Sequence, residues 1–161
     1  VLESIGDMWA NNDISVAEEH LASNTIRNAV YALGETLERK DYKDNSYTLS
    51  LALSGDEHDL PLIMTKQILE IKGIPVINCG RNTPANSIKR LLKKFQPDKI
   101  IVSLTYIEDK KLAKQELDDL LKIASKTHAK IYVGGAGIQY INGQQLKNVQ
   151  LLHSMSDVAQ I

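Results

Sequence analysis

Asp56 and His58 lie two residues apart in a polar stretch of the chain and can form a metal-binding pair. An imidazole binds a metal through one ring nitrogen while a carboxylate holds the other nitrogen and fixes the tautomer. The apolar run 47–53 before them predicts a buried strand, and Pro61 followed by apolar residues at helical spacing predicts a helix over 61–72. His58 is therefore expected in a loop at the carboxyl end of a strand, where open α/β sheets carry their ligand crevice. Taken alone, such a triplet is more often a solvated acidic loop.

Two further polar or glycine-rich groups follow later strands. Ser103 and Thr105 alternate at the end of the predicted strand 99–105, so both hydroxyls face one side and can bind a polar ligand or cap the next helix. Gly134 and Gly135 end the next apolar strand, where glycine either allows close backbone approach to a ligand or simply makes a turn. Their spacing is not that of a dinucleotide-binding fingerprint.

A fourth group of candidate residues lies in the first forty residues. Trp9, the only tryptophan, falls near the end of a predicted helix over residues 1–10. Glu19 and His20 fall in the first turns of a second predicted helix, over 15–40, whose start carries a capping box. The two helices form an antiparallel pair in which these residues can meet, either as a site or as ordinary core packing.

Beyond a polar segment at 40–46, the periodicity switches to alternating strands and helices. The predicted strands cover 47–53, 74–78, 99–105, 130–133 and 149–153. The predicted helices cover 61–72, 84–95, 111–126 and a poorly signalled segment in 142–148. In the helix over 84–95, Thr83 is the expected cap and Pro84 lies in the first turn. This pattern predicts an α/β fold: a flavodoxin-like, five-stranded parallel sheet with strand order 2-1-3-4-5, preceded by a small helical bundle. The expected domains are residues 1–42 and 46–161. The loops after strands one and three then line one crevice at the switch point of the sheet.

Composition narrows the class of protein. The 161 residues are 43% apolar and 24% charged with a net charge of −1, which is typical of a globular domain without an electrostatic footprint for DNA. One cysteine, Cys79, excludes an intrachain disulfide and agrees with a cytoplasmic location. No apolar run approaches the roughly 20 residues of a membrane span. The chain begins at Val1 in mid-pattern, so we expect a piece of a longer protein.

Together, Asp56-x-His58-x-x-Pro61, Ser103-Leu104-Thr105 and Gly134-Gly135 resemble the signature of cobalamin-binding domains. The segment from Gly80 to Pro84 also resembles the loop after the second strand of that fold. The resemblance implies that His58 is the lower axial ligand of cobalt, with Asp56 behind it. It further implies that the nucleotide tail of the cofactor lies near Ser103, Leu104, Thr105, Gly134 and Gly135.

Trp9, followed after nine residues by Glu19-His20, resembles the bundle motif of MerR-type, adenosylcobalamin-dependent light-sensing regulators. This implies that Trp9, Val16, Glu19 and His20 contact the upper face of adenosylcobalamin. Ala10 stands where photoreceptor members can carry a cobalt-binding His. The chain is then expected to be a sensor module rather than an enzyme, homo-oligomeric, with DNA bound only by a domain outside this chain. Two alternatives stay open: a corrinoid carrier protein of a methyltransferase system, and a flavodoxin-like domain without cobalamin.

Overall fold

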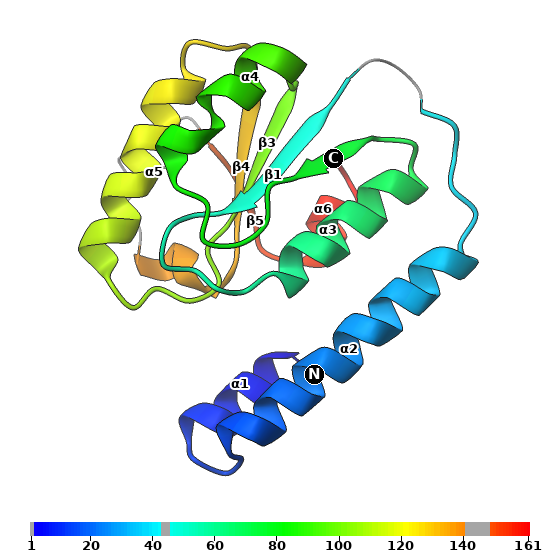
Figure 1. Cartoon of the computed structure of the whole chain (residues 1–161), viewed down its shortest axis with the longest axis vertical. Coiled ribbons are helices and arrows are strands. Elements are labelled where there is room, and N and C mark those ends of the chain that lie inside the picture. Colours follow the sequence, from blue (N-terminus) through cyan, green and yellow to red (C-terminus); the bar gives the residue numbers. More distant parts are fainter. Residues whose placement is uncertain (1, 43–45, 141–148) are drawn as a thin grey trace. The chain divides into compact units, whose positions relative to one another are not determined.

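A computed structural model describes residues 2–42, 46–140 and 149–161. The chain divides into two compact units, Val1–Glu38 and Arg39–Ile161. Each unit is described by itself below, and both are drawn in Figure 1.

The N-terminal unit is a pair of helices, α1 (Leu2–Ala10) and α2 (Val16–Thr36), that contact each other. The capping box predicted at the start of α2 is confirmed. Ser15 Oγ accepts from the Glu18 backbone N–H at 3.3 Å, and the Glu18 carboxylate accepts from the Ser15 N–H at 2.8 Å. The bonds that the Ser15 backbone N–H and hydroxyl donate to the carboxylate lower the pKa of Glu18. The helix ends four residues before the predicted end at Lys40, because the residue after Thr36 already has an extended backbone.

The second unit is built on a five-stranded parallel sheet, as predicted. Its strands are β1 (Thr48–Ala52), β2 (Val76–Asn78), β3 (Lys99–Ser103), β4 (Lys130–Gly134) and β5 (Gln150–Leu152), in the order β2-β1-β3-β4-β5. The predicted flavodoxin-like order is confirmed. Because β1 and β3 are neighbours in space, the loops that follow them lie at the switch point of the sheet.

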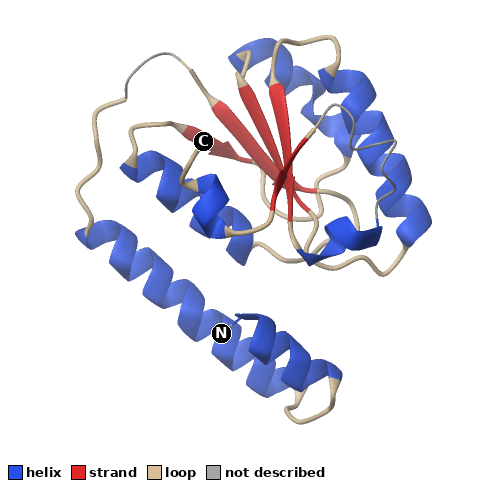
Figure 2. Ribbon diagram, turned by 180° about the vertical axis from the view of Figure 1, so that it is seen from behind, coloured by secondary structure: helices blue, strands red, loops and turns tan. Residues whose placement is uncertain are grey.

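Helices cover both faces of this sheet (Figures 1 and 2). They are α3 (Leu60–Ile71), the 3-10 turn η1 (Ala85–Ile88) leading into α4 (Lys89–Phe95), α5 (Lys110–Ala124), the 3-10 turn η2 (Ala136–Tyr140) and α6 (Met155–Val158). No helix within the described residues is both long and apolar enough to cross a membrane.

Alternating side chains of the strands divide the core into two layers. One layer packs strand residues against η1, α4 and α5, and its fully buried members include Leu49, Leu51, Ile88, Ile100, Val102, Leu117 and Leu120. The other packs strand residues against α3 and α6, and its members are Leu69, Val76, Ile101, Tyr132, Leu152 and Val158. The face of each strand residue is therefore known from its place in the alternation.

One predicted helix start is wrong. Thr83 does not cap the helix that follows it; Pro84 takes the cap position with no side-chain hydrogen bond, and Thr83 Oγ1 donates instead to the Cys79 carbonyl at 3.2 Å. The orphan N–H of Ala85 is satisfied from a distant helix, because Glu116 Oε2 of α5 accepts from it at 2.7 Å.

The C-terminal helix α6 was not expected from the sequence. It has only four residues, too few for a helical period, and is fixed by a capping box in which Ser154 and Asp157 accept from each other's backbone N–H. The helix predicted within 142–148 lies outside the described residues.

Candidate functional site

Asp56 and His58 form the pair that their spacing predicts. The carboxylate of Asp56 is 3% exposed, and its Oδ1 lies 2.9 Å from His58 Nδ1 while accepting from the His58 backbone N–H at 3.0 Å. A carboxylate only accepts, so the neutral imidazole carries its proton on Nδ1 and its lone pair on Nε2. The His58 side chain is 49% exposed. The pair therefore presents a metal-binding nitrogen at the carboxyl edge of the sheet.

The carboxylate and the backbone carbonyl of Asp56 join its loop to the loops of two neighbouring strands. Asp56 Oδ2 accepts from the backbone N–H of Thr105 after β3 at 2.6 Å. The Asp56 carbonyl accepts from the backbone N–H of Asn82 after β2 at 3.0 Å. We call these contacts of Asp56 with His58, Thr105 and Asn82 the three-loop bracket. It fixes the direction of His58 before any ligand is present.

Asn82 strengthens this bracket and was missed by sequence reasoning. Its backbone is left-handed, with φ 49°, and its side chain accepts from the Gly55 N–H at 3.0 Å and donates to Glu57 Oε1 at 2.7 Å. Arg81 Nε lies 3.3 Å from the other carboxylate oxygen of Glu57. Asparagine tolerates left-handed backbone better than most residues, which was the one available signal.

Ser103 and Thr105 do face one side, as their alternation predicts, with their hydroxyls 3.1 Å apart. Ser103 lies in register with Ala52 of β1 and Gly134 of β4. These three small residues form a row, called the small-residue row below, on the face covered by α3 and α6. On the opposite face, the carboxyl edge is filled by leucine side chains of the core. At the carboxyl edge, small side chains therefore lie on one face of the sheet and large ones on the other.

Gly134 and Gly135 have packing reasons of their own. Gly135 has φ +112°, and a Cβ there would lie 2.3 Å from the Leu104 carbonyl oxygen. A Cβ on Gly134 would lie 3.3 Å from Leu152 Cβ. The Leu104 side chain is itself buried in the core, so only its backbone borders the loop of Gly135. A ligand role for these residues stays a prediction.

Tyr106 is a second neighbour of His58 that sequence reasoning missed. The two ring centroids are 6.0 Å apart with the planes tilted by 49°, and Tyr106 is 48% exposed. An aromatic residue directly after a strand that ends at a predicted crevice was the signal that could have found it.

The donor set suits one kind of metal centre. Among the described residues, no three His, Cys, Asp or Glu side chains converge on a common point. A single oriented imidazole is too few ligands for a free zinc or iron ion, which take four or more. It is sufficient for a metal whose remaining ligands arrive with a macrocycle, as cobalt does in a corrinoid. The residues present therefore fit this cofactor.

Comparisons with known proteins agree with this chemistry. The chain is 20% identical over 140 residues to the trimethylamine corrinoid protein of Methanosarcina barkeri, and 24% identical over 139 residues to the HTH-type transcriptional repressor CarH of Myxococcus xanthus. These matches cover 85% and 84% of this chain but only 64% and 44% of the two relatives.

Solved structures with the same fold include the monomethylamine corrinoid protein of Methanosarcina barkeri (TM-score 0.78, 16% identity) and a cobalamin-binding protein of Desulfitobacterium hafniense (TM-score 0.58, 17% identity). Both superpose on 99% of this chain and cover 76% and 75% of the other chain. They establish the fold.

A family model adds an independent match to the helical unit. Residues 1–33 match the B12 binding domain family. These findings support a cobalamin-binding domain. The family match covers the helix pair, whereas the Asp56–His58 pair belongs to the other unit, so the two lines of support come from different parts of the chain.

The helical unit carries the residues that the resemblance assigns to the upper face of the cofactor. Trp9 in α1 and Val16 in α2 are 43% and 55% exposed, and the His20 side chain is 69% exposed. Glu19 is partly buried, and its Oε1 accepts from Ser23 Oγ at 2.6 Å. Three of the four thus present their side chains at the surface of this unit, and their contact with a cofactor stays a prediction.

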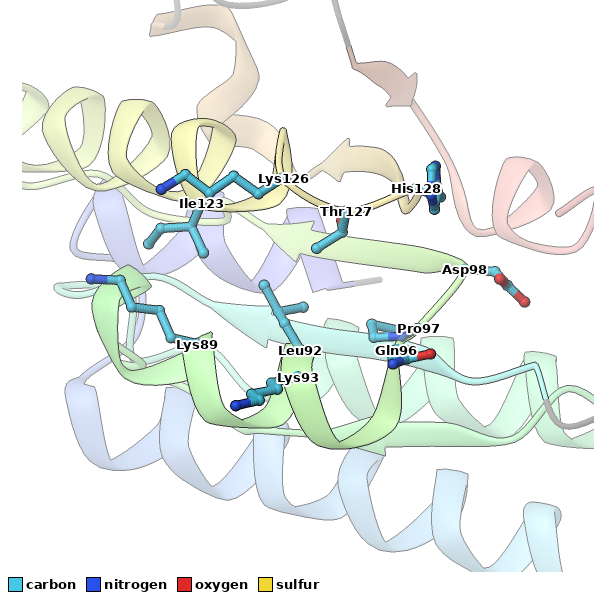
Figure 3. A pocket seen from close by; sticks show the side chains of 10 residues that line it. All are labelled: Lys89, Leu92, Lys93, Gln96, Pro97, Asp98, Ile123, Lys126, Thr127 and His128. Carbon is cyan, nitrogen blue, oxygen red and sulfur yellow. The ribbon is translucent and has the colours of Figure 1, made fainter.

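A hollow of about 690 Å³ lies at the amino ends of β3 and β4, the edge opposite to His58 (Figure 3). It is lined by Lys89, Leu92, Lys93, Gln96, Pro97, Asp98, Ile123, Lys126, Thr127 and His128. None of the predicted site residues borders it, so it has no part in the candidate site.

Proposed function

We propose that this chain binds adenosylcobalamin, with His58 as the lower ligand of cobalt, and acts as the sensor module of a transcriptional regulator. The observation that carries the proposal is the 2.9 Å contact between Asp56 and His58 Nδ1. It puts the proton on Nδ1 and the lone pair on Nε2 of an imidazole whose direction the three-loop bracket fixes. When bound, adenosylcobalamin supplies a cobalt–carbon bond that light can cleave.

The residues of this chain have separate tasks in that proposal. Asp56 keeps the proton on His58 Nδ1, which holds the ligating tautomer and raises the basicity of Nε2. Tyr106 lies beside the imidazole, with the two ring centroids 6.0 Å apart. The nucleotide tail lies next to Ser103 and the small-residue row on the face covered by α3 and α6.

The sensor role rests on the helical unit. The Trp9 and Glu19-His20 motif resembles that of light-sensing regulators, and the similarity to the repressor CarH extends over 84% of this chain. A flat indole surface suits an adenosyl group, and Glu19 can accept from its hydroxyl or amino groups. In this proposal the module catalyses no reaction, self-associates, and acts on DNA through a domain outside this chain.

A second candidate is a corrinoid carrier of a methyltransferase system. The similarity to the trimethylamine corrinoid protein over 85% of this chain favours it. A carrier must leave the upper face open to methyl donors and acceptors, so it should not distinguish strongly between upper ligands.

Titration of the protein with adenosylcobalamin and methylcobalamin, followed by visible absorption in the dark, separates these candidates. A bound cofactor would cover the partly buried Glu19, and a covered acceptor that lacks a partner costs about 1–3 kcal/mol. The sensor should therefore bind adenosylcobalamin roughly ten-fold or more tightly than methylcobalamin, and Trp9→Ala should remove this difference. Equal affinities would favour the carrier.

The His58→Ala variant tests the lower ligand in the same titration. It should lose tight binding or leave the cofactor coordinated by its own base, with a changed spectrum. Glu57→Gln, in the same loop but 59% exposed, serves as the control and should bind like the wild type. Size-exclusion profiles before and after green illumination then report whether cleavage of the cobalt–carbon bond changes self-association, and an unchanged profile would contradict a light-driven switch.

A further inference from the structure

The hollow at the amino ends of β3 and β4 has the size of a ligand site. Its volume of about 690 Å³ falls within the roughly 300–1,000 Å³ of small-molecule pockets in proteins. Leu92 and Pro97, which line it, are both buried, and Ile123 is packed against the core. These three side chains form an apolar floor on which a flat ligand can lie.

Three lysines line the same hollow against one carboxylate, that of Asp98. Within the described residues, none of the three ammonium groups forms an ion pair. Lys93 and Lys126 lie at the C-terminal ends of α4 and α5, where a cation interacts favourably with the helix dipole. Lys89 begins α4 and is outside the reach of that effect. This local excess of positive charge, in a chain of net charge −1, points to an anionic ligand.

The charged groups are divided between the two ends of the hollow (Figure 3). The side chains of Lys89 and Lys126 extend toward one end, whereas Asp98 and His128 lie at the other, with Gln96 on the same side as Asp98. An anionic group held by the two lysines therefore leaves the rest of its molecule over the apolar floor. The far edge of that molecule then reaches the carboxylate and the amide.

Gln96 has a backbone conformation that favours glycine. It follows the last turn of α4 with φ 44° and ψ 56°, directly before Pro97. A left-handed residue at a helix end is most often glycine or asparagine, because a Cβ is unfavourable there. Unfavourable backbone of this kind is concentrated at functional sites, and the Gln96 side chain lines the hollow.

We propose that this hollow binds a nucleoside diphosphate, with Lys89 and Lys126 at the phosphates and the base over the apolar floor. Ammonium groups are common phosphate ligands in proteins. A carboxylate only accepts hydrogen bonds, so Asp98 accepts from an amino group of the base, while the Gln96 amide can donate and accept at the same edge.

The inference goes beyond the proposed function and does not depend on it. The hollow lies at the edge of the sheet opposite to His58, so the two ligands can be bound at once. ADP should therefore bind whether or not the chain has bound adenosylcobalamin.

Calorimetric titration with ADP, adenosine and inorganic pyrophosphate tests the class of ligand. ADP should bind at least about ten-fold more tightly than adenosine or pyrophosphate, because only ADP occupies both the cationic end and the apolar floor. Lys89→Gln should weaken ADP binding about ten-fold, the usual effect of losing a hydrogen bond to a charged group. Lys94→Gln is the matched control in the same helix: Lys94 lies over the Phe95 ring and does not line the hollow, so this variant should bind like the wild type.

Gln96→Gly separates a ligand contact from a structural role. Glycine removes the unfavourable Cβ, so the unfolding midpoint of the free protein should rise by about 2–4 °C while the affinity for ADP falls. A lower midpoint, or an unchanged affinity, would overturn the assignment of Gln96 to the ligand.

Four results would overturn the site itself. They are no heat of binding with ADP at millimolar concentration, pyrophosphate binding as tightly as ADP, equal effects of Lys89→Gln and Lys94→Gln, and displacement of ADP by adenosylcobalamin. Failure of adenosylcobalamin to bind would overturn the proposed function and leave the ADP titrations as they stand.

Discussion

Replacing Asp56 by Asn tests the three-loop bracket most directly. The two carboxylate oxygens accept three hydrogen bonds, from the backbone N–H and Nδ1 of His58 and from the backbone N–H of Thr105. An amide of the same size keeps one accepting oxygen and turns the other into a donor. No orientation of Asn can therefore satisfy all three groups.

The two orientations have different costs. With its oxygen toward His58, Asn places an NH₂ group against the Thr105 N–H and loses one bond. With its oxygen toward Thr105, it loses the bond from the His58 backbone N–H and donates to Nδ1 instead of accepting from it, which moves the imidazole proton to Nε2, the nitrogen that has to bind the metal. A hydrogen bond to a charged group contributes about 1.5–3 kcal/mol, so the smaller loss is already about 2 kcal/mol. The unfolding midpoint should fall by about 4–8 °C.

Cofactor affinity should fall by about 10–100-fold in Asp56→Asn, the usual effect of losing the partner of a metal-binding histidine. Thermal unfolding of the free protein and titration with adenosylcobalamin measure the two effects separately. Glu57→Gln is the matched control, because it removes a charge from the same loop at an exposed position and keeps an oxygen that can accept from Asn82. If Asp56→Asn matched Glu57→Gln in both measurements, the bracket would have no role in holding His58.

Three further predictions concern the scaffold. Gly135→Ala should destabilise the free protein by about 3 kcal/mol or more, because the new Cβ meets a backbone carbonyl in addition to the cost of positive φ. Gly80→Ala, with φ +85° and open space around it, should cost only about 1–2 kcal/mol, and equal unfolding midpoints of the two variants would contradict the close packing at Gly135. Burial raises the pKa of the Cys79 thiol, so iodoacetamide should alkylate it more slowly in the native protein than in the unfolded chain at every pH below that pKa, and equal rates would show that the thiol is accessible. The backbone N–H of His153 lowers the pKa of Asp157 in the folded protein. The Asp157 carboxylate therefore stabilises α6 at pH values above the pKa of the unfolded chain, and this stabilisation is lost as the pH falls through the lower pKa of the folded state. Amide exchange in α6 should accelerate over that acidic range in the wild type but not in Asp157→Asn.

The sequence was sufficient for the strand order and for the central pair of the site. Both depend on local patterns: alternating strand and helix periods give the parallel sheet, and a spacing of two residues puts Asp56 beside His58. The capping box at Ser15 is equally local, since its two partners are three residues apart.

Features that depend on register between distant segments were not predictable. Asn82 reaches Glu57 in the loop of His58 from 25 residues away along the chain, and Glu116 caps a helix start 31 residues before it. That the buried hydroxyl of Ser50 has no partner among the described residues is visible only when the faces of all neighbouring strands are known. The short helix α6 has too few residues to show a period, and the expected cap at Thr83 failed because a carboxylate from another helix took its place.

The three-loop bracket consists largely of main-chain atoms. Apart from the Asp56 carboxylate and the His58 ring, its participants are peptide groups, including the N–H groups of Thr105 and Asn82. Every residue except proline supplies such a group, so the side chain of Thr105 can change while its loop stays tied to Asp56. Position 82 also needs a residue that tolerates a left-handed backbone. Mutational drift around the site is then constrained at Asp56, His58 and Asn82 and tolerated at Thr105. A chain of this design can diverge to 16% identity from a structure that it still matches with a TM-score of 0.78.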